Sequence, residues 1–200
     1  MTFLRDIALL ALPATLSGMM AAAVVPAGRS GGDERAALSQ LVKDGDFKDA
    51  YAGYRHLALD PTSDPHRVGG DLTQGIECLR RLNRVAEIDA FREAVIEVHQ
   101  GNWRTLWAAA ESYVRVDHYG VLVAGQFERG RRRGGGQVVS GLDRDRVRAL
   151  QLFQRAMPLV ADAPDRDQVG RFYLALARAL LLDRGYREAW RFQSLTDLDR

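Results

Sequence analysis

A short run of arginines set among glycines is the part of the sequence best suited to binding a ligand. Within the segment 128–137, the candidate contact residues are Arg129, Arg131, Arg132 and Arg133. A guanidinium group pairs with the oxygens of phosphate or carboxylate groups, and glycines let the backbone approach closely. The segment therefore predicts either a site for RNA or another anion, or a solvated loop whose arginines pair with carboxylates of neighbouring helices.

Two features favour the solvated loop. Only one aromatic residue, Phe127, lies nearby, whereas proteins that bind single-stranded nucleic acid stack the bases on several aromatic side chains. The segment also lacks the terminal Gly-Lys-Ser/Thr of a phosphate-binding loop. The net charge of +2 adds little general attraction for nucleic acid or an anionic membrane. We therefore expect no nucleic-acid partner, and anion binding by this segment is the alternative function.

The residue types that usually bind metals or carry out catalysis are scattered. None of the four histidines has another histidine or a cysteine at metal-ligand spacing: His56, His66, His99 and His118. Asp117 precedes His118, but adjacent side chains do not face one another, so no general-base role is assigned. The single cysteine, Cys78, excludes an internal disulfide and is expected to face the core. The sequence predicts no catalytic residue, no metal, no cofactor and no enzyme activity.

The tryptophans and one charged run have ordinary structural explanations. Trp103, Trp107 and Trp190 are expected to pack between helices. Trp103 directly follows Asn102, a residue type that begins helices, so it is also a candidate partner contact. Acids and arginines alternate from Asp143 to Arg148. This run predicts acids at a helix start, followed by a solvated helix face.

Hydrophobic spacing and capping residues predict a chain made almost entirely of helices. The predicted helices span residues 33–43, 46–59, 68–82, 86–100, 103–116, 143–160, 165–182 and 186–194. Pro158 is expected to kink or shorten the helix that contains it. Seven glycines fall between residues 118 and 141, so this stretch is predicted to be one long irregular loop.

Small and aromatic residues recur along the helices in one pattern. One copy of its second half follows a turn at Gly45: Phe47, Ala50, Tyr54 and Leu57. Another copy spans both halves: Tyr173, Leu176, Ala177, Leu180, Tyr186 and Ala189. This spacing is typical of helical hairpins of the tetratricopeptide type. We therefore predict an all-α fold of stacked hairpins over residues 28–200, interrupted by the long Gly/Arg-rich loop.

The N-terminal residues have a different character. Arg5 precedes a short apolar run from Ile7 to Leu16, and small residues lead to Val25-Pro26-Ala27. This order is typical of a secretory signal peptide, which predicts residues 1–27 as the signal and an exported protein. An uncleaved anchor and a buried helix are the alternatives, although Pro13 breaks the apolar run and leaves it short for a membrane-spanning helix.

Several segments together resemble the helical N-terminal region of large exported bacterial alpha-2-macroglobulin-like proteins. The resemblance covers most of the chain beyond about Asp44. It rests on these stretches: Asn102-Trp103-Arg104, His118-Tyr119-Gly120, Ala124-Gly125-Gln126-Phe127, Arg133-Gly134-Gly135-Gly136, Asp143 to Leu152, Tyr186 to Arg191, and Leu195 to Leu198. The resemblance implies a longer protein with β-sandwich domains that traps proteases.

The reactive thioester of some family members has no counterpart here, because Cys78 lies in Glu77-Cys78-Leu79-Arg80 and not in a Cys-Gly-Glu-Gln type motif. No bait or thioester residue carries over. The resemblance therefore implies a non-catalytic helical scaffold at the front of an exported protein. Its partner would be another protein, such as a protease, or the remaining domains of the same chain.

Overall fold

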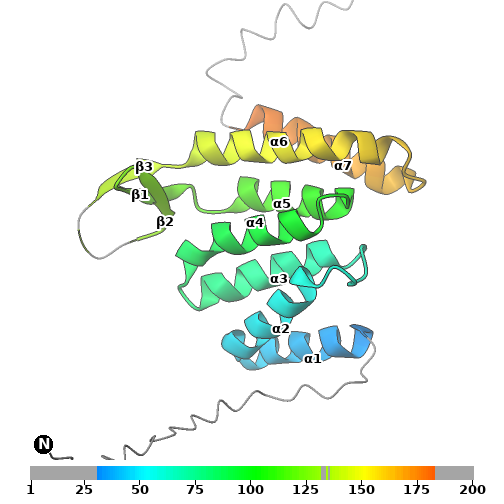
Figure 1. Cartoon of the computed structure of the whole chain (residues 1–200), viewed down its shortest axis with the longest axis horizontal. Coiled ribbons are helices and arrows are strands. Elements are labelled where there is room, and N and C mark those ends of the chain that lie inside the picture. The colour runs from blue at the N-terminus through cyan, green and yellow to red at the C-terminus, as the bar shows by residue number, and fades with distance from the viewer. Residues whose placement is uncertain (1–30, 132–133, 135, 183–200) are drawn as a thin grey trace, which may run out of the picture.

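The computed structural model describes residues 31–131, 134 and 136–182, and this part of the chain is mostly helical (Figure 1). Four predictions lie outside the described residues: the signal peptide at 1–27, the helix at 186–194, the packing of Trp190 between helices, and the contacts of Arg132 and Arg133. The described helices are α1 (Gly31–Asp44), α2 (Phe47–Leu59), α3 (Val68–Arg81), the 3-10 turn η1 (Val85–Glu87), α4 (Ile88–Val98), α5 (Trp103–Arg115), α6 (Leu142–Ala161) and α7 (Arg166–Leu181).

Local capping explains three of the helix boundaries. The Asn102 side chain accepts a hydrogen bond from the backbone N–H of Arg104 at 3.0 Å, and Asp165 accepts one from Gln168 at 3.1 Å. Both acceptors satisfy N–H groups that the first turn of a helix leaves free. Gly45 ends α1 in a left-handed conformation, with a φ of 88°. The predictions of these three boundaries are confirmed.

The bounds of α6 lie within a residue of the predicted 143–160, but two residues expected to shape the helix act differently. Asp143 was expected to cap this helix, but the cap position is Gly141 and the helix begins at Leu142. Pro158 was expected to kink or shorten α6, yet the helix includes it and continues to Ala161. Pro158 forgoes one hydrogen bond to the preceding turn, and burial of the flanking Ala156 and Val160 on the inner face of α6 offsets that loss.

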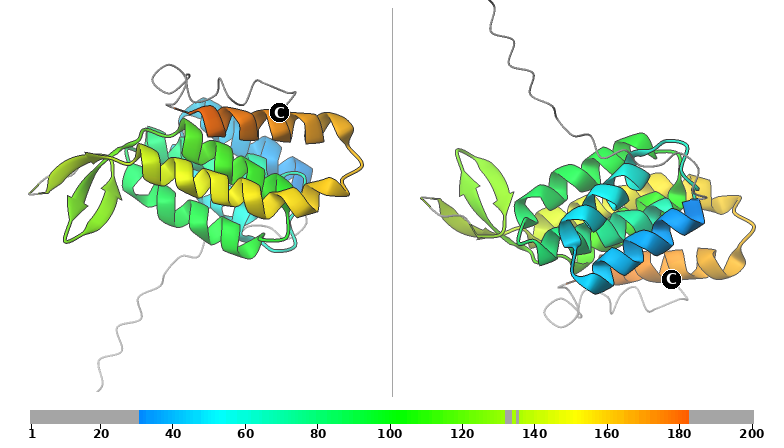
Figure 2. Two further views of the ribbon diagram at one scale, coloured as in Figure 1. Left: turned by 90° about the horizontal axis from the view of Figure 1, so that it is seen from above. Right: turned by 90° about the horizontal axis from the view of Figure 1, so that it is seen from below.

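The helices pack in a stack that runs from α1 to α6 and α7 (Figure 1). α2 lies between α1 and α3, α3 packs directly on α5, and α5 packs on α6. α1 and α7 lie on one side of the stack and α4 on the other (Figure 2). One core runs through it, with Leu72, Leu106 and Leu152 fully buried, and Cys78 belongs to this core as predicted. The expectation of an all-α chain is thus largely met by the described helices.

The exception is the segment 118–141, where the predicted irregular loop is wrong. The chain forms an antiparallel sheet of β1 (Tyr119–Val123), β2 (Gln126–Arg129) and β3 (Gln137–Ser140), in the order β2-β1-β3. Val123 pairs with Gln126, so Ala124 and Gly125 alone form the turn, with φ values of 48° and 79°. A two-residue turn of this kind, with φ positive at both positions, matches the twist of a hairpin.

Glycines in this segment also allow close packing within the sheet. A Cβ at Gly120 would lie 2.6 Å from the Phe127 ring and 2.4 Å from the carbonyl oxygen of Glu128. A Cβ at Gly141 would lie 2.7 Å from the same ring. The Phe127 ring therefore covers two glycines, one in β1 and one just before α6. The sheet, inserted between α5 and α6, projects from the side of the stack, beyond the ends of these two helices (Figures 1 and 2).

Candidate functional site

Arg129, predicted as a possible partner or anion contact, is instead buried inside the molecule. The side chain lies at the end of β2 and is 3 % exposed. Its Nε donates to Asp89 Oδ1 at 2.9 Å, and its Nη2 donates to Asp145 Oδ1 at 2.7 Å and to Asp89 Oδ2 at 3.1 Å. Its Nη1 donates to Asp145 Oδ2 at 2.9 Å and to the carbonyl oxygen of Asp117 at 2.8 Å. An arginine has five N–H groups, so every one is used within the molecule and the prediction is wrong.

The residues around this guanidinium form a buried ionic group, which we call the Arg129 cluster: Arg129, Asp89, Asp145, Arg144 and His118. Arg144 Nη1 lies 2.9 Å from Asp89 Oδ2 and 3.0 Å from Asp145 Oδ1. His118 Nδ1 lies 2.9 Å from Asp145 Oδ2. The fully buried Arg92 also lies 3.5 Å from Asp89 Oδ1, whereas the Arg144 side chain is 45 % exposed. The buried guanidinium groups of Arg129 and Arg92 therefore balance the two carboxylates. Such pairing is needed because an unpaired charge in the interior is strongly destabilising.

The electrostatics of the cluster favour the ionised form of Asp89. Burial alone would raise the pKa of Asp89, but hydrogen bonds and Coulombic attraction from Arg129 outweigh it, so the pKa of Asp89 is lowered. The pKa of Arg129 is raised because the same carboxylates oppose the effect of its burial. The Phe127 ring adds cation–π contacts, with Arg144 Cζ at 4.8 Å and Arg129 Cζ at 5.5 Å from its centroid. The cluster therefore links β2 to α4 and α6.

Two further interpretations of the sequence change with this cluster. The run from Asp143 to Arg148 was expected to be a solvated face, but Asp145 is fully buried and Arg148 forms an ion pair with Glu93 on α4. His118 was given no role beside Asp117, and its partner is Asp145, twenty-seven residues further on. An aspartate that orients one nitrogen of a histidine is found in catalytic sites. Here that carboxylate is already paired with Arg129 and Arg144, which favours a structural role.

Trp103 was also a candidate partner contact, and the structure places it in the core. Its ring is 6 % exposed and stacks on Trp107, with centroids 6.0 Å apart. It also meets the edge of Phe172 on α7 at 6.1 Å. The packing prediction for this tryptophan is therefore confirmed, and the partner-contact prediction is wrong.

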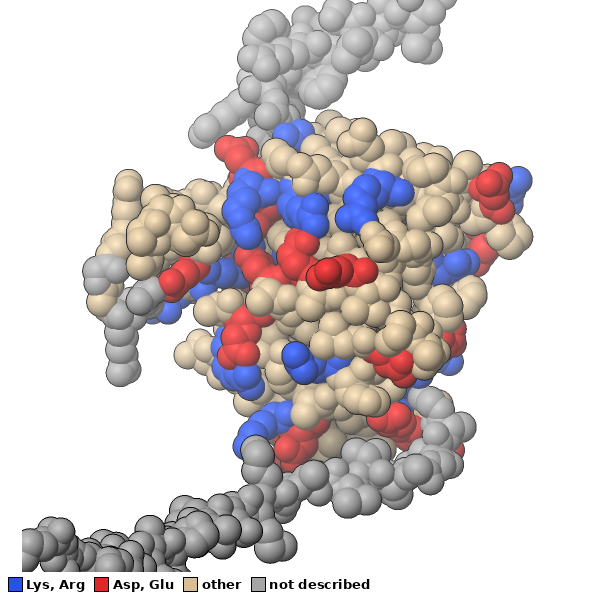
Figure 3. Space-filling view, viewed as in Figure 1, with Lys and Arg blue, Asp and Glu red and all other residues tan. Residues whose placement is uncertain are grey.

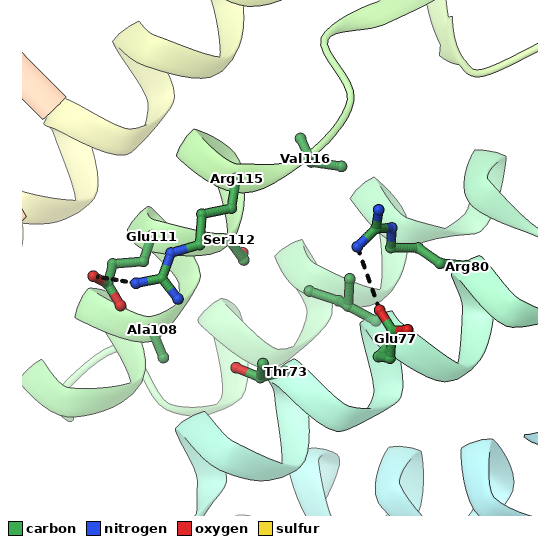
Figure 4. Close-up of a pocket in the computed structure, with 9 residues that line it drawn as sticks. Thr73, Glu77, Arg80, Ala108, Glu111, Ser112, Arg115 and Val116 are labelled. Atoms are coloured by element: carbon green, nitrogen blue, oxygen red, sulfur yellow. Dashed lines mark hydrogen bonds and ion pairs between the residues drawn. The ribbon is translucent and has the colours of Figure 1, made fainter. Parts of the chain in front are cut away.

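A different surface collects exposed polar and charged side chains beside α3 and α5. Three adjoining hollows follow these two helices, and we call them together the α3–α5 groove. The first, about 220 Å³, lies toward α7 and includes Arg104 and Gln168. The second, about 180 Å³, lies between Thr73 and Ser112 (Figure 4). The third, about 800 Å³, reaches the sheet at Arg131.

Shared lining residues make these hollows one continuous surface. Ala108 and Glu111 line both the first and the second hollow. Glu77 and Arg80 line both the second and the third. The groove therefore runs from the N-terminal end of α3, past its middle, to β1 and β2.

The charged residues of the groove pair along each wall. Glu77 pairs with Arg80 on α3 at 3.3 Å, and Glu111 pairs with Arg115 on α5 at 2.8 Å (Figure 4). Neither pair spans the groove. Exposed pairs of this kind contribute only about 0.2–1 kcal/mol, so each partner can exchange its contact for a ligand group. Arg131 is exposed, and within the described ranges it makes no ion pair. Arg129 also lines the third hollow, but its N–H groups are all used within the molecule.

The opposite side of the molecule carries both charge signs close together. In Figure 3, lysine and arginine side chains alternate with acids over the helices, and no broad basic patch is visible on that face. In the described ranges, no helix is long and apolar enough to cross a membrane. Those ranges also hold no group of three or more histidine, cysteine or acidic residues arranged to bind a metal ion.

The chain matches no protein-family model, no curated protein and no solved structure. The resemblance to alpha-2-macroglobulin-like proteins therefore stays a prediction. The assignment of the α3–α5 groove as the candidate site therefore rests on its geometry. Sequence reasoning missed the groove because its residues come from two helices that are not consecutive in the chain. The one local signal was Gly69, where a Cβ would lie 2.8 Å from that of Ala108: a glycine in a helix often marks close approach of a neighbour.

Proposed function

We propose that this domain is a non-catalytic scaffold that binds an extended segment of a partner protein in the α3–α5 groove. Its helices pair as consecutive hairpins of the tetratricopeptide type: α1 with α2, α3 with α4, and α5 with α6. In this arrangement the first helix of one hairpin lies against the first helix of the next, as α3 lies on α5. The sheet is then an insertion inside the third hairpin.

The continuity of the groove is the observation that carries this proposal. A peptide in extended form is long and narrow, and three hollows joined by shared residues provide a surface of that shape. The partly exposed Trp107 and the nearly buried Ile76 supply apolar contact. Charged groups of both signs line the walls. A mixed surface suits a peptide, whose side chains and backbone offer donors, acceptors and apolar groups together.

The larger protein in which we place this domain is proposed from the predicted export and the family resemblance. In an exported alpha-2-macroglobulin-like protein, the groove would receive a segment of another domain of the same chain or of a target protease. Protease trapping would then belong to the whole protein. The groove itself needs only to bind and position a segment.

A substitution that fills the groove tests the proposal. Linear peptides are selected from a displayed random library against the purified chain, and the affinity of the best peptide is measured by fluorescence anisotropy. Thr73→Trp places a bulky ring in the middle of the groove and is expected to weaken binding at least about tenfold, or 1.4 kcal/mol. Gln74→Trp, at the next and exposed position of α3, is the matched control and should bind as the wild type. Equal binding by both variants would contradict the proposal.

Anion binding is the second candidate, and it now depends on the sheet end of the groove. Arg131, Arg80 and Arg81 line the largest hollow together. Arg129 contributes nothing to an external anion, since its donors are all used. Binding of single-stranded RNA to the chain, measured against salt concentration, distinguishes the two functions. A steep loss of RNA affinity with salt that Arg131→Ala reduces would favour the anion site. The peptide proposal predicts only weak RNA binding.

A further inference from the structure

The sheet end of the α3–α5 groove offers an excess of arginine donors. Three exposed arginines line the third hollow: Arg80, Arg81 and Arg131. Glu77 pairs with two of them, since its Oε1 lies 2.8 Å from Arg81 Nε and its Oε2 lies 3.3 Å from Arg80 Nη1. One carboxylate therefore serves two guanidinium groups, each of which has five N–H groups. Most of these donors face solvent and can bind an acceptor from a ligand.

The charges along the groove differ from one hollow to the next. Besides Glu77, the exposed Asp117 lines the third hollow, so two carboxylates face three exposed arginines there. The buried Arg129 adds nothing to this excess, because Asp89 and Asp145 pair with it. The second hollow has two arginines and two glutamates among its lining residues. The excess of positive charge is therefore confined to the sheet end.

The opposite end of the groove is suited to an apolar side chain. The partly exposed Trp107 lines the first hollow together with Gly70 of α3. No atom lies within 4 Å of a Cβ built at Gly70, so this glycine leaves open space. The Nε of Arg104, which also lines the hollow, donates to Gln168 Oε1 at 2.8 Å. Glycine is a poorer helix former than alanine, and its use here fits a ligand that approaches α3 closely.

The length of α3 gives the distance between the two ends. Gly70 and Arg81 are eleven residues apart on this helix. At 1.5 Å per residue they are separated by about 16 Å along the helix axis. An extended peptide advances about 3.3 Å per residue, so about five residues of a bound segment cover this distance.

We propose that the groove selects partner segments in which an acidic side chain binds the sheet-end arginines and an apolar side chain, about five residues away, packs against Trp107 beside Gly70. This inference rests on the proposed function, since it names the partner of the same groove. A carboxylate suits the sheet end better than RNA does. Nucleic acid carries a phosphate at every nucleotide, whereas the rest of the groove has no excess of positive charge.

Peptides selected from a displayed random library against the whole chain provide the probe. We expect them to share an acidic residue and an apolar residue about five positions apart. The best peptide is then synthesised with its acid, and again with the corresponding amide, and both affinities are measured by fluorescence anisotropy. The amide peptide should bind about threefold to tenfold more weakly, because it loses charge-assisted hydrogen bonds to the arginines.

Variants of the chain locate this preference. The double variant Arg81→Gln/Arg131→Gln should bind the acid and amide peptides equally. Its matched control is Arg155→Gln/Arg178→Gln, which removes the same charge from exposed positions of α6 and α7 and should keep the wild-type preference. Asp117→Asn removes a competing carboxylate from the hollow, so it should strengthen binding of the acid peptide by about twofold and leave the amide peptide unchanged.

Gly70→Ala tests the apolar end of the groove. The added methyl group takes up space in the first hollow, so this variant should weaken both peptides by the same factor. Circular dichroism should show an intact helical fold, because alanine favours the helix. Unchanged binding of both peptides would contradict the assignment of the apolar side chain to this hollow.

The outcomes separate this inference from the function on which it rests. Peptides that Thr73→Trp weakens, but that show no preference for acid over amide, would overturn the inference and leave the groove as the binding surface. Peptides that Thr73→Trp does not affect would overturn both. Single-stranded RNA that displaces the acid peptide, and whose own binding Arg81→Gln/Arg131→Gln abolishes, would assign the arginines to phosphate and also overturn the inference.

Discussion

The helical stack and the three-stranded sheet are held in place by different interactions. In the stack, the contacts between helices come mainly from fully buried apolar side chains such as Leu72, Leu106 and Phe153. In the sheet, Val121 is the only fully buried apolar side chain of the described strands, and the ion pairs of the Arg129 cluster join the sheet to the stack, beside contacts between β2 and η1. The stability of the stack therefore comes from many small contributions, while the attachment of the sheet depends largely on the ion pairs of Arg129.

This difference predicts how each region responds to damage. Apolar burial contributes in proportion to area, so the loss of one side chain is local and graded. A buried ion pair fails abruptly, since removal of one partner leaves the others charged and unpaired in the interior. The largest loss of stability is therefore expected where a buried charge loses its partner.

Arg129→Met is expected to cause the largest loss. It leaves Asp89 and Asp145 buried with fewer partners, and breaking such a group costs about 3–5 kcal/mol. Urea unfolding measures the free energy change. Hydrogen exchange should show that amides of β1 and β3 lose protection before those of α2 and α3. Arg131→Met removes an exposed arginine nearby and should change stability by less than about 0.5 kcal/mol.

The triple variant Arg129→Met/Asp89→Asn/Asp145→Asn sharpens this result. It removes the stranded charges together with the arginine, so it should be less destabilised than Arg129→Met alone. If the triple variant were the less stable of the two, unpaired charge would not be the cause of the loss.

Gly120→Ala is expected to have an intermediate effect confined to the sheet. The added Cβ meets both the Phe127 ring and a backbone carbonyl oxygen, and overpacking of this kind costs about 1–3 kcal/mol. Gly70→Ala in α3 is the control for a glycine that has free space around it, because no atom lies within 4 Å of a Cβ at that position. Alanine is the better helix former, so this variant should gain up to about 0.5–1 kcal/mol. Thermal unfolding of both variants gives the comparison, and equal losses would contradict it.

The smallest effect is expected from acid. The pKa of Asp89 is lowered in the folded protein, mainly by Arg129 acting against burial. A group with a lowered folded pKa contributes stability above its unfolded value, about 3.9, and this contribution is lost as the pH falls through the folded pKa. Chemical unfolding between pH 7 and pH 2 should therefore show a decrease below about pH 4 that Asp89→Asn reduces. Asp49→Asn, at an exposed position of α2, should follow the wild-type curve.

The difference between the stack and the sheet also explains which features could be predicted from the sequence. The boundaries of α2 and α5 were predicted to within about a residue because Gly45, Asn102 and Asp60-Pro61 act on the helix ends next to them. The face of α6 that packs inward was harder to predict. Val147 and Met157 fit an apolar stripe, but they are 51 % and 36 % exposed. The buried face includes Asp145 instead, because Arg129 from the sheet pairs with it.

The sheet and the groove depend on contacts between residues far apart in the chain. Glycines in the segment 118–141 indicate turns and loops equally well, and only the pairing of Val123 with Gln126 shows that Gly125 is a hairpin turn. Arg129 pairs with Asp89, which lies forty residues earlier in the chain, and no local pattern in the sequence indicates that pair. The groove likewise needs the packing of α3 on α5. What the sequence lacks is the three-dimensional neighbourhood of each residue, not the residue types.

Photo-crosslinking with a selected peptide tests the central claim most directly. A peptide chosen for binding to the chain would carry benzoylphenylalanine at each position in turn, and mass spectrometry would locate the crosslinked residues. We predict crosslinks on the facing sides of α3 and α5, around Thr73, Ala108 and Ser112, which line the middle of the groove. Crosslinks gathered on α2, α4 or α6 would place the binding surface on the other side of the stack and contradict the account.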